Sequence, residues 1–212
     1  MATILSWFLE NLSFWSIFLL MTIESSFIPF PSEVVVPPAA YLVAQGQLDG
    51  FGVILSAVLG SLVGALINYA LAYYLGRPLI YAFVKSKLGK MLLLSEEKLV
   101  KSEEYFDKKG AISTFIGRLI PGIRQFISIP AGLSKMHMTP FILYTLLGAG
   151  IWTCILFWLG WWAASIPEID TSEKLIEWVS KYSHWIGYGI LLLVALFIGI
   201  KFMQHLRKHK SN

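Results

Sequence analysis

The chain has 212 residues, of which 56% are hydrophobic and only 14% are charged, against about 25% charged residues in an average soluble domain. This composition excludes an ordinary soluble domain and favours a polytopic membrane protein. In a membrane protein, a net charge of +4 mostly reflects basic residues in cytoplasmic loops. It is weak evidence for nucleic-acid binding, because the basic residues do not alternate with exposed aromatic residues. The single cysteine, Cys154, lies in an apolar run, which excludes an intrachain disulfide and a cysteine cluster for metal.

The first predicted element is a helix over residues 4–23, which leads into a broken apolar stretch over residues 24–38. This stretch carries the carboxylates Glu24 and Glu33. A carboxylate at membrane depth costs about 2.5–3.5 kcal/mol, and broken backbone is tolerated there only inside protein or beside a water-filled cavity. We therefore predict a re-entrant hairpin over about residues 24–45. Prolines, which interrupt helices, stand at Pro29, Pro31, Pro37 and Pro38.

Residues 51–75 form the first apolar run long enough to cross a bilayer. The G-x-x-x-G spacing at Gly60 and Gly64 favours close approach of a second helix. Asn68 is the one strongly polar residue of this span. An isolated asparagine in such a span more often forms a helix–helix contact than a ligand contact.

Lysines and acidic residues alternate over residues 85–110, which predicts an amphipathic helix at the cytoplasmic surface. Residues 111–134 then repeat the opening pattern, because they are apolar, broken, and carry Arg118 and Arg124. We predict a second re-entrant hairpin there. The residues expected to shape the backbone of the two hairpins are Pro29, Pro31, Pro121, Gly122, Pro130 and Gly132.

A second span is predicted over residues 140–164, an acidic loop over 166–182, and a last span over 185–200. The positive-inside rule places the basic loop 77–110 and the C-terminus in the cytoplasm. The two spans then run in opposite directions, and the two hairpins enter from opposite faces. The predicted fold is therefore an all-α polytopic membrane protein, one domain over residues 1–212, in which two inverted re-entrant hairpins meet near the midplane.

The two halves also share a spacing of glycines, which suggests an internal repeat. The interval from Gly64 to Gly76 equals the interval from Gly148 to Gly160, and both end in two aromatic residues, leucine and glycine.

Four charged residues fall at membrane depth, Glu24 and Glu33 on one hairpin and Arg118 and Arg124 on the other. One interpretation is that two buried salt bridges hold the hairpin tips together. In the other, the planar guanidinium groups bind a phosphate and the carboxylates carry protons. Two facts favour the second interpretation: buried ion pairs add little net stability, and intramembrane charges often mark substrate pathways. Polar neighbours expected to line the cavity are Ser25, Ser26, Ser32, Gln125 and Ser128.

Enzymatic readings find no support in the sequence. G-x-S-x-G, H-E-x-x-H and P-loop motifs are missing from it, and no histidine lies near the four charges. We therefore expect a transporter that uses no cofactor and no metal.

The segments E-S-S-F-I-P-F-P-S-E at 24–33, F-I-G-R-L-I-P-G-I-R at 115–124 and I-P-A-G-L at 129–133 resemble the bacterial DedA family of the VTT superfamily. The resemblance covers about residues 10–165. It implies a lipid flippase of the bacterial cytoplasmic membrane, with Glu24 and Glu33 as the acidic pair and Arg118 and Arg124 as the arginine pair. It also implies proton coupling.

The leading functional hypothesis is translocation of undecaprenyl phosphate, a membrane lipid with a phosphate head group. Flipping or scrambling of phosphatidylethanolamine or another phospholipid is the alternative within transport, and an ion or small-solute antiporter is a third. A structural or assembly protein is the alternative of another class. The sequence does not identify the lipid, the direction of transport or the coupling ion. It also leaves open whether the protein forms a homodimer and which glutamate titrates.

Overall fold

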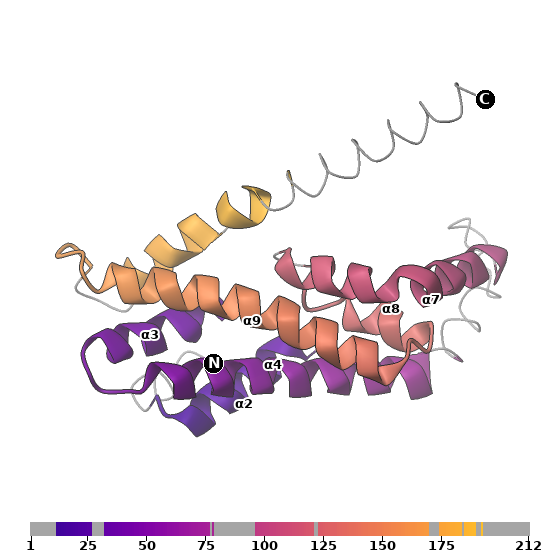
Figure 1. Ribbon diagram of the computed structural model, residues 1–212, viewed down its shortest axis with the longest axis horizontal. Helices are drawn as coiled ribbons and strands as arrows, with labels where there is room; N and C mark the ends of the chain where they lie inside the picture. The colour runs from indigo at the N-terminus through magenta and orange to yellow at the C-terminus, as the bar shows by residue number, and fades with distance from the viewer. Residues whose placement is uncertain are drawn as a thin grey trace.

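The computed structural model describes most of the chain, and every regular element in the part that it describes is a helix (Figure 1). Pro29, Pro31, Pro121 and Gly122 lie outside the described residues, as do the basic tail and most of the predicted last span. For residues 96–103, 105 and 107 only the backbone is described. The described residues are 12–26, 32–76, 78, 96–120, 123–169, 174–183, 185–189 and 192.

Two short helices lie on either side of the first broken stretch and overlap its ends. Helix α2 (Phe14–Ser25) has 12 residues and α3 (Val36–Ala44) has nine, so at 1.5 Å per residue they extend about 18 and 14 Å. Each is too short for the roughly 30 Å of a bilayer core. Between them lies the 3-10 turn η1 (Ser32–Val34).

The ends of these helices follow from local chemistry. Ser13 and Ser16 form a reciprocal capping box at the start of α2, which satisfies backbone N–H groups that have no partner within the helix. Pro37 and Pro38 lie in the first turn of α3, where a missing N–H breaks no helical bond. These two prolines therefore begin a helix, although the sequence suggested that they turn the chain.

The two predicted spans are confirmed as long apolar helices, α4 (Gly50–Leu71) and α9 (Met138–Ala163). Helix α4 continues as the π-helical turn η2 (Ala72–Gly76), and both helices are long and apolar enough to cross a membrane. Their outward faces are also apolar, with Phe51 and Leu55 exposed on α4 and Leu147 and Trp158 exposed on α9. Helices that are apolar on all sides are typical of membrane spans.

Helix α7 (Glu96–Leu119) crosses the predicted boundary between the amphipathic segment and the second hairpin. Gly117 does not interrupt it: Ile127 packs over the face of this glycine, where an added Cβ would lie 2.6 Å from Ile127 Cγ1. The break comes after Leu119, and the short helix α8 (Ser128–Leu133) follows it. The second broken stretch is therefore built from the end of a long helix.

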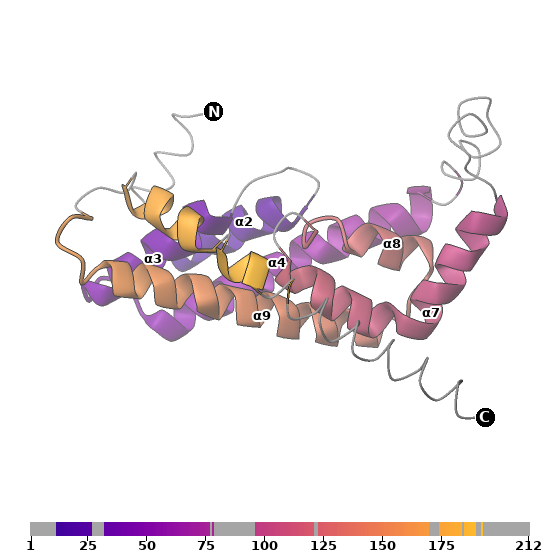
Figure 2. The same cartoon turned by 90° about the horizontal axis from the view of Figure 1, so that it is seen from above.

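The two halves of the chain repeat the same packing. Helices α4 and α9 lie side by side and run in opposite directions (Figures 1 and 2). Gly64 lets the end of α2 approach α4, and Gly148 lets the end of α7 approach α9. Further along, Gly76 contacts α8 and Gly160 contacts α3. Glycines matched by the repeat thus occupy matching places, which explains their shared interval.

The predicted loop over 166–182 is wrong in part, because residues 174–183 form a helix. Leu175, Val179 and Ser183 are buried and follow one another at the i, i+4 spacing of one helix face. Leu175 and Val179 join an apolar cluster that also contains residues of α3 and α9. The segment was predicted as a loop because its acidic residues outweigh the three residues of its buried face.

Two apolar clusters form the core. One contains residues of α2, α3, α4, α9 and 174–183, and the other lies among α4, α7, α8 and α9. On α4, Ala57 belongs to the first cluster and Ala65 to the second. Ser61 lies between them in the middle of the helix, and the polar pocket opens at this level.

Candidate charged site

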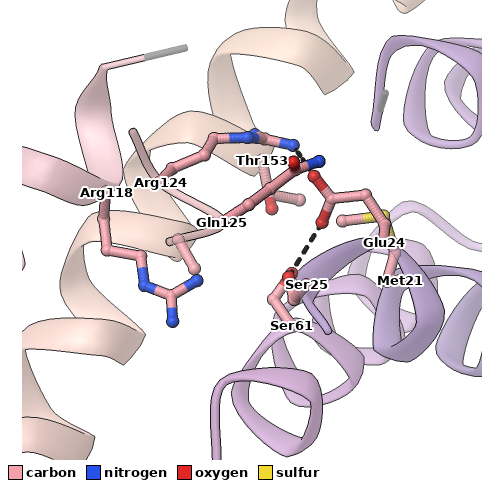
Figure 3. Close-up of a pocket in the computed structure, with 9 residues that line it drawn as sticks. Met21, Glu24, Ser25, Ser61, Arg118, Arg124, Gln125 and Thr153 are labelled. Atoms are coloured by element: carbon pink, nitrogen blue, oxygen red, sulfur yellow. Dashed lines mark hydrogen bonds and ion pairs between the residues drawn. The ribbon is translucent and has the colours of Figure 1, made fainter. Parts of the chain in front are cut away.

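A small polar pocket lies where α2 ends and where the chain breaks between α7 and α8 (Figure 3). Its empty volume is about 280 Å³, which includes space open to solvent. The side chains leave room between them for roughly one water, so the pocket is narrow. Its polar and charged lining residues are Glu24, Ser25, Ser61, Arg118, Arg124, Gln125 and Thr153.

Arg124 connects three parts of the fold. Its Nη2 group forms an ion pair with Glu24 Oε1 and donates a hydrogen bond of 2.5 Å to Ser32 Oγ. The guanidinium carbon lies 5.5 Å from the centre of the Trp152 ring of α9, within the range of a cation–π contact. Ser25 Oγ donates to Glu24 Oε2 at 2.8 Å, so both carboxylate oxygens have partners.

Arg118, at the end of α7, is buried with 3% of its surface exposed. Its Nη2 group donates to Ser128 Oγ at 2.8 Å, and its Nε has no hydrogen-bond partner within the described residues. Leaving a buried N–H unpaired costs about 1–3 kcal/mol. The described lining of the pocket therefore contains two guanidinium groups and one carboxylate, Glu24, which pairs with Arg124.

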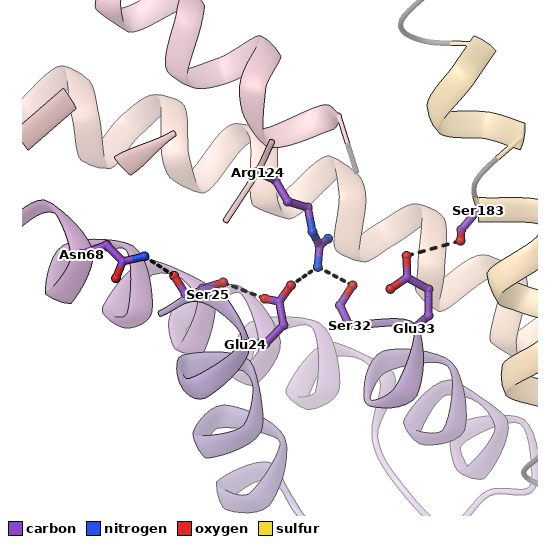
Figure 4. A network of polar contacts seen from close by, with 7 residues as sticks. All are labelled: Glu24, Ser25, Ser32, Glu33, Asn68, Arg124 and Ser183. Carbon is purple, nitrogen blue, oxygen red and sulfur yellow. Dashed lines mark hydrogen bonds and ion pairs between the residues drawn. The ribbon is translucent and has the colours of Figure 1, made fainter. Parts of the chain in front are cut away.

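Glu33 does not form the second ion pair that the four charges suggested, as far as the described residues show. Its Oε1 lies 3.3 Å from Ser183 Oγ on the helix over residues 174–183. Figure 4 shows Ser32 directed to Arg124 and Glu33 directed to Ser183. The tight turn of η1 sends these two adjacent side chains to different neighbours, which is why only Glu24 meets an arginine.

Asn68 joins the two broken stretches. Its Nδ2 group donates to the backbone oxygen of Ser25 and to that of Gln125, both at 3.2 Å. The sequence predicted a helix–helix contact at this position. The structure shows that the contact lies directly beside the pocket and links both of its halves.

The residues that were predicted to line the cavity or to shape the hairpin backbone occupy different places in the structure. Ser25 and Gln125 line the pocket, and Ser128 contacts Arg118 from outside the described lining. Ser26 Oγ donates to the Ile23 carbonyl at 2.6 Å and is not part of that lining. Pro130 and Gly132 belong to α8.

Sequence reasoning missed Ser61, Thr153 and Ser183. Each is a small hydroxyl residue within a helix. A signal was available only for Ser183, which interrupts an apolar stripe.

These observations define a helical membrane protein in which a narrow site with charged side chains lies between two long apolar helices. The VTT domain family matches residues 28–162, more than half of the chain, and the chain belongs to this family.

Three similar proteins come from bacteria. An alkaline phosphatase-like protein of Lactococcus lactis subsp. lactis (strain IL1403) is 34% identical over 91% of this chain and 89% of its own length. Undecaprenyl phosphate transporter A of Bacillus subtilis (strain 168) is 33% identical over 93% of this chain and 92% of its own length. Protein DedA of Escherichia coli (strain K12) is 23% identical over 73% of this chain and 68% of its own length. These relatives confirm the resemblance to the DedA family, and no solved structure matches the chain significantly.

Proposed function

We propose that this protein is a lipid translocase that carries undecaprenyl phosphate across the bacterial cytoplasmic membrane. The observation that carries the proposal is the charge of the pocket: Arg118 is buried there, Arg124 keeps only 11% of its side chain exposed, and Glu24 is the one carboxylate in the described lining. A phosphate supplies the missing negative charge and accepts hydrogen bonds from guanidinium groups. The name of the Bacillus subtilis relative, an undecaprenyl phosphate transporter, supports this lipid.

In the proposed cycle, the phosphate competes with Glu24 for Arg124. It also accepts a hydrogen bond from Arg118 Nε, which has no partner in the described residues. Protonation removes the charge of Glu24, so proton binding frees Arg124 for the lipid. Because the pocket holds about one water, the two broken stretches must separate before a phosphate enters. The lipid tail stays along the apolar outer faces of α4 and α9.

The positions of the lining residues within their helices favour a location of the pocket near the middle of the membrane. Ser61 and Thr153 of the pocket lie in the interior of α4 and α9, and α2 and α3 are too short to span. We therefore propose that both broken stretches are re-entrant hairpins. The charge pattern supports a cytoplasmic position for residues 77–110 and for the C-terminus.

Phosphatidylethanolamine is the less favoured substrate because its amine needs a free acceptor. Glu33, the second carboxylate, contacts Ser183 and is not part of the described pocket lining. The name of the Lactococcus lactis relative raises a phosphatase activity. The described lining does contain hydroxyl groups and the carboxylate of Glu24, but Glu24 is already paired with Arg124, and no histidine stands beside a hydroxyl group there to activate it as a nucleophile.

A structural or assembly role is the second candidate, and one observation favours it. The pocket is narrow, and the ion pair of Glu24 with Arg124 already joins its two halves. In that case the charges would serve packing alone.

Flipping assays in liposomes test these candidates with fluorescent undecaprenyl phosphate and fluorescent phosphatidylethanolamine. We expect the wild-type protein to flip the former, and Arg118→Ala and Arg124→Ala to lose at least tenfold in rate. Lys108→Ala is the matched control, because Lys108 is an exposed cation on α7. Wild-type rates in both arginine variants would overturn the proposal. Flipping of phosphatidylethanolamine alone would support the second lipid, and no flipping by the folded protein would support the structural role.

A further inference from the structure

The helix over residues 174–183 places one polar side chain on its buried face. Leu175 and Val179 pack in the apolar core, and the next residue of the same stripe is Ser183, with 0% of its surface exposed. The reason for a serine at this position is its neighbour. Ser183 Oγ lies 3.3 Å from Glu33 Oε1, as Figure 4 shows.

The contacts of Ser183 depend on where one proton lies. Its Oγ is also 3.0 Å from the carbonyl oxygen of Ser180. A hydroxyl group has one hydrogen to donate, and a carbonyl oxygen only accepts. Both contacts are therefore hydrogen bonds at the same time only when Glu33 is protonated and donates to Ser183. When Glu33 is ionised, the hydroxyl must turn from Ser180 to Glu33, and one of the two bonds is lost.

We infer that Ser183 is a positioning residue for Glu33, and that it couples protonation of this carboxyl group to the docking of helix 174–183. When Glu33 carries a proton, the carboxyl group donates to Ser183 and Ser183 keeps its hydrogen bond to the Ser180 carbonyl, so the docking contact and the last turn of the helix are both satisfied. When the proton is lost, Ser183 donates to Glu33 instead, and the loss of its bond to Ser180 loosens the docked end of the helix.

Among the described residues around this contact, the charged groups are directed elsewhere. The guanidinium of Arg124 contacts Ser32 and Glu24. Helices α3 and α9 contain no charged residue. The charged residues of the helix itself, Lys174, Glu177 and Lys181, are all exposed.

The inference deepens the proposed function, because Glu33 is one of the two carboxyl groups proposed to carry protons. It adds a part of the chain that the family match over residues 28–162 does not include. Through Ser183, the protonation state of Glu33 affects the helix over residues 174–183.

Hydrogen–deuterium exchange of the full-length protein in lipid nanodiscs tests the inference without measuring transport. Amide protection of residues 174–183 is followed across pH and corrected for the intrinsic exchange rate. We expect protection to increase by about 3- to 10-fold at acidic pH, the effect of one hydrogen bond. Glu33→Gln should give high protection at every pH, because its amide donates permanently to Ser183.

The remaining variants separate positioning from simple packing. Ser183→Ala should give low protection with no pH dependence, and Ser183→Thr should restore the wild-type profile. Two controls should keep the wild-type profile. Glu177→Gln removes an exposed charge from the same helix, and Ser165→Ala removes the hydroxyl that donates to the Trp162 carbonyl at 2.7 Å.

Protection that is independent of pH in the wild-type protein would overturn the inference. An unchanged pH profile in Ser183→Ala would overturn it equally. If Ser183→Ala does not fold, Ser183→Thr and Glu33→Gln decide the outcome. Because lipid flipping is not measured, a failure of the proposed function in the liposome assay remains distinguishable from a failure here.

Discussion

Arg124 forms an ion pair with Glu24, a residue 100 positions earlier in the chain, and this pair joins the two broken stretches inside the molecule. Removing one partner of a buried ion pair leaves an uncompensated charge and costs about 3–5 kcal/mol. The pair is therefore expected to be important for folding, whether or not it also binds a substrate.

A charge swap separates these two roles. We expect Arg124→Glu alone to lower the melting temperature strongly, and Glu24→Arg with Arg124→Glu to recover much of that loss, because the pair is re-formed with its partners exchanged. Flipping of undecaprenyl phosphate should stay below a tenth of the wild-type rate, because Ser32 and Trp152 then face a carboxylate. Thermal unfolding in detergent and the liposome assay measure the two effects. Transport at the wild-type rate by the double variant would show that the Glu24–Arg124 pair serves packing and that substrate binding does not need the cation at position 124.

Glu24 is also the proposed proton carrier of the pocket. Glu24→Gln keeps the shape of the side chain and can still accept a hydrogen bond from Arg124, but it cannot bind or release a proton. We expect lipid flipping by this variant to lose its response to a pH gradient imposed across the liposome membrane. Retention of the wild-type response would assign proton coupling to another residue, and Glu33→Gln measured in parallel tests the second carboxyl group.

Gly148 sets the position of Arg118. An added Cβ at Gly148 would lie 2.5 Å from Arg118 Cβ, so Gly148→Ala must displace the end of α7. We expect at least a tenfold loss of flipping. Gly150→Ala on the same helix is the matched control, because no atom lies within 4 Å of its added Cβ, and it should retain the wild-type rate. Equal rates for the two variants would contradict the role assigned to this contact.

Asn68 holds both broken stretches through two backbone oxygens. Asn68→Ala leaves the Ser25 and Gln125 carbonyls without this donor, which should destabilise the protein by about 0.6–1.7 kcal/mol for each hydrogen bond in a membrane. Asn68→Asp should be worse, because a carboxylate of the same shape then faces two carbonyl oxygens. The order of melting temperatures, wild type above Ala above Asp, checks this. An Asp variant as stable as the wild type would show that the Asn68 hydrogen bonds are dispensable.

Much of the architecture was predictable because it depends on neighbouring residues. The hydropathy of α4 and α9 located both spans to within a few residues, and the prolines and charges marked both broken stretches. Helix 174–183 was not predicted, because its acidic residues suggested a loop and its buried face consists of only three residues. The run of α7 through Gly117 depended on Ile127, which comes after the break and packs back on it.

Local sequence patterns were enough to establish a helical membrane protein with four charged residues in broken apolar stretches. Composition and hydropathy carry that information, since the free energy of placing each segment in lipid depends on its own side chains. Only the tertiary structure decided how the charges are distributed, with Glu24 on Arg124 and Glu33 on Ser183. These contacts join residues 100 and 150 positions apart. The direction of each side chain there is set by the turn of η1 and by the packing of α2, α4 and α9, which no local pattern records.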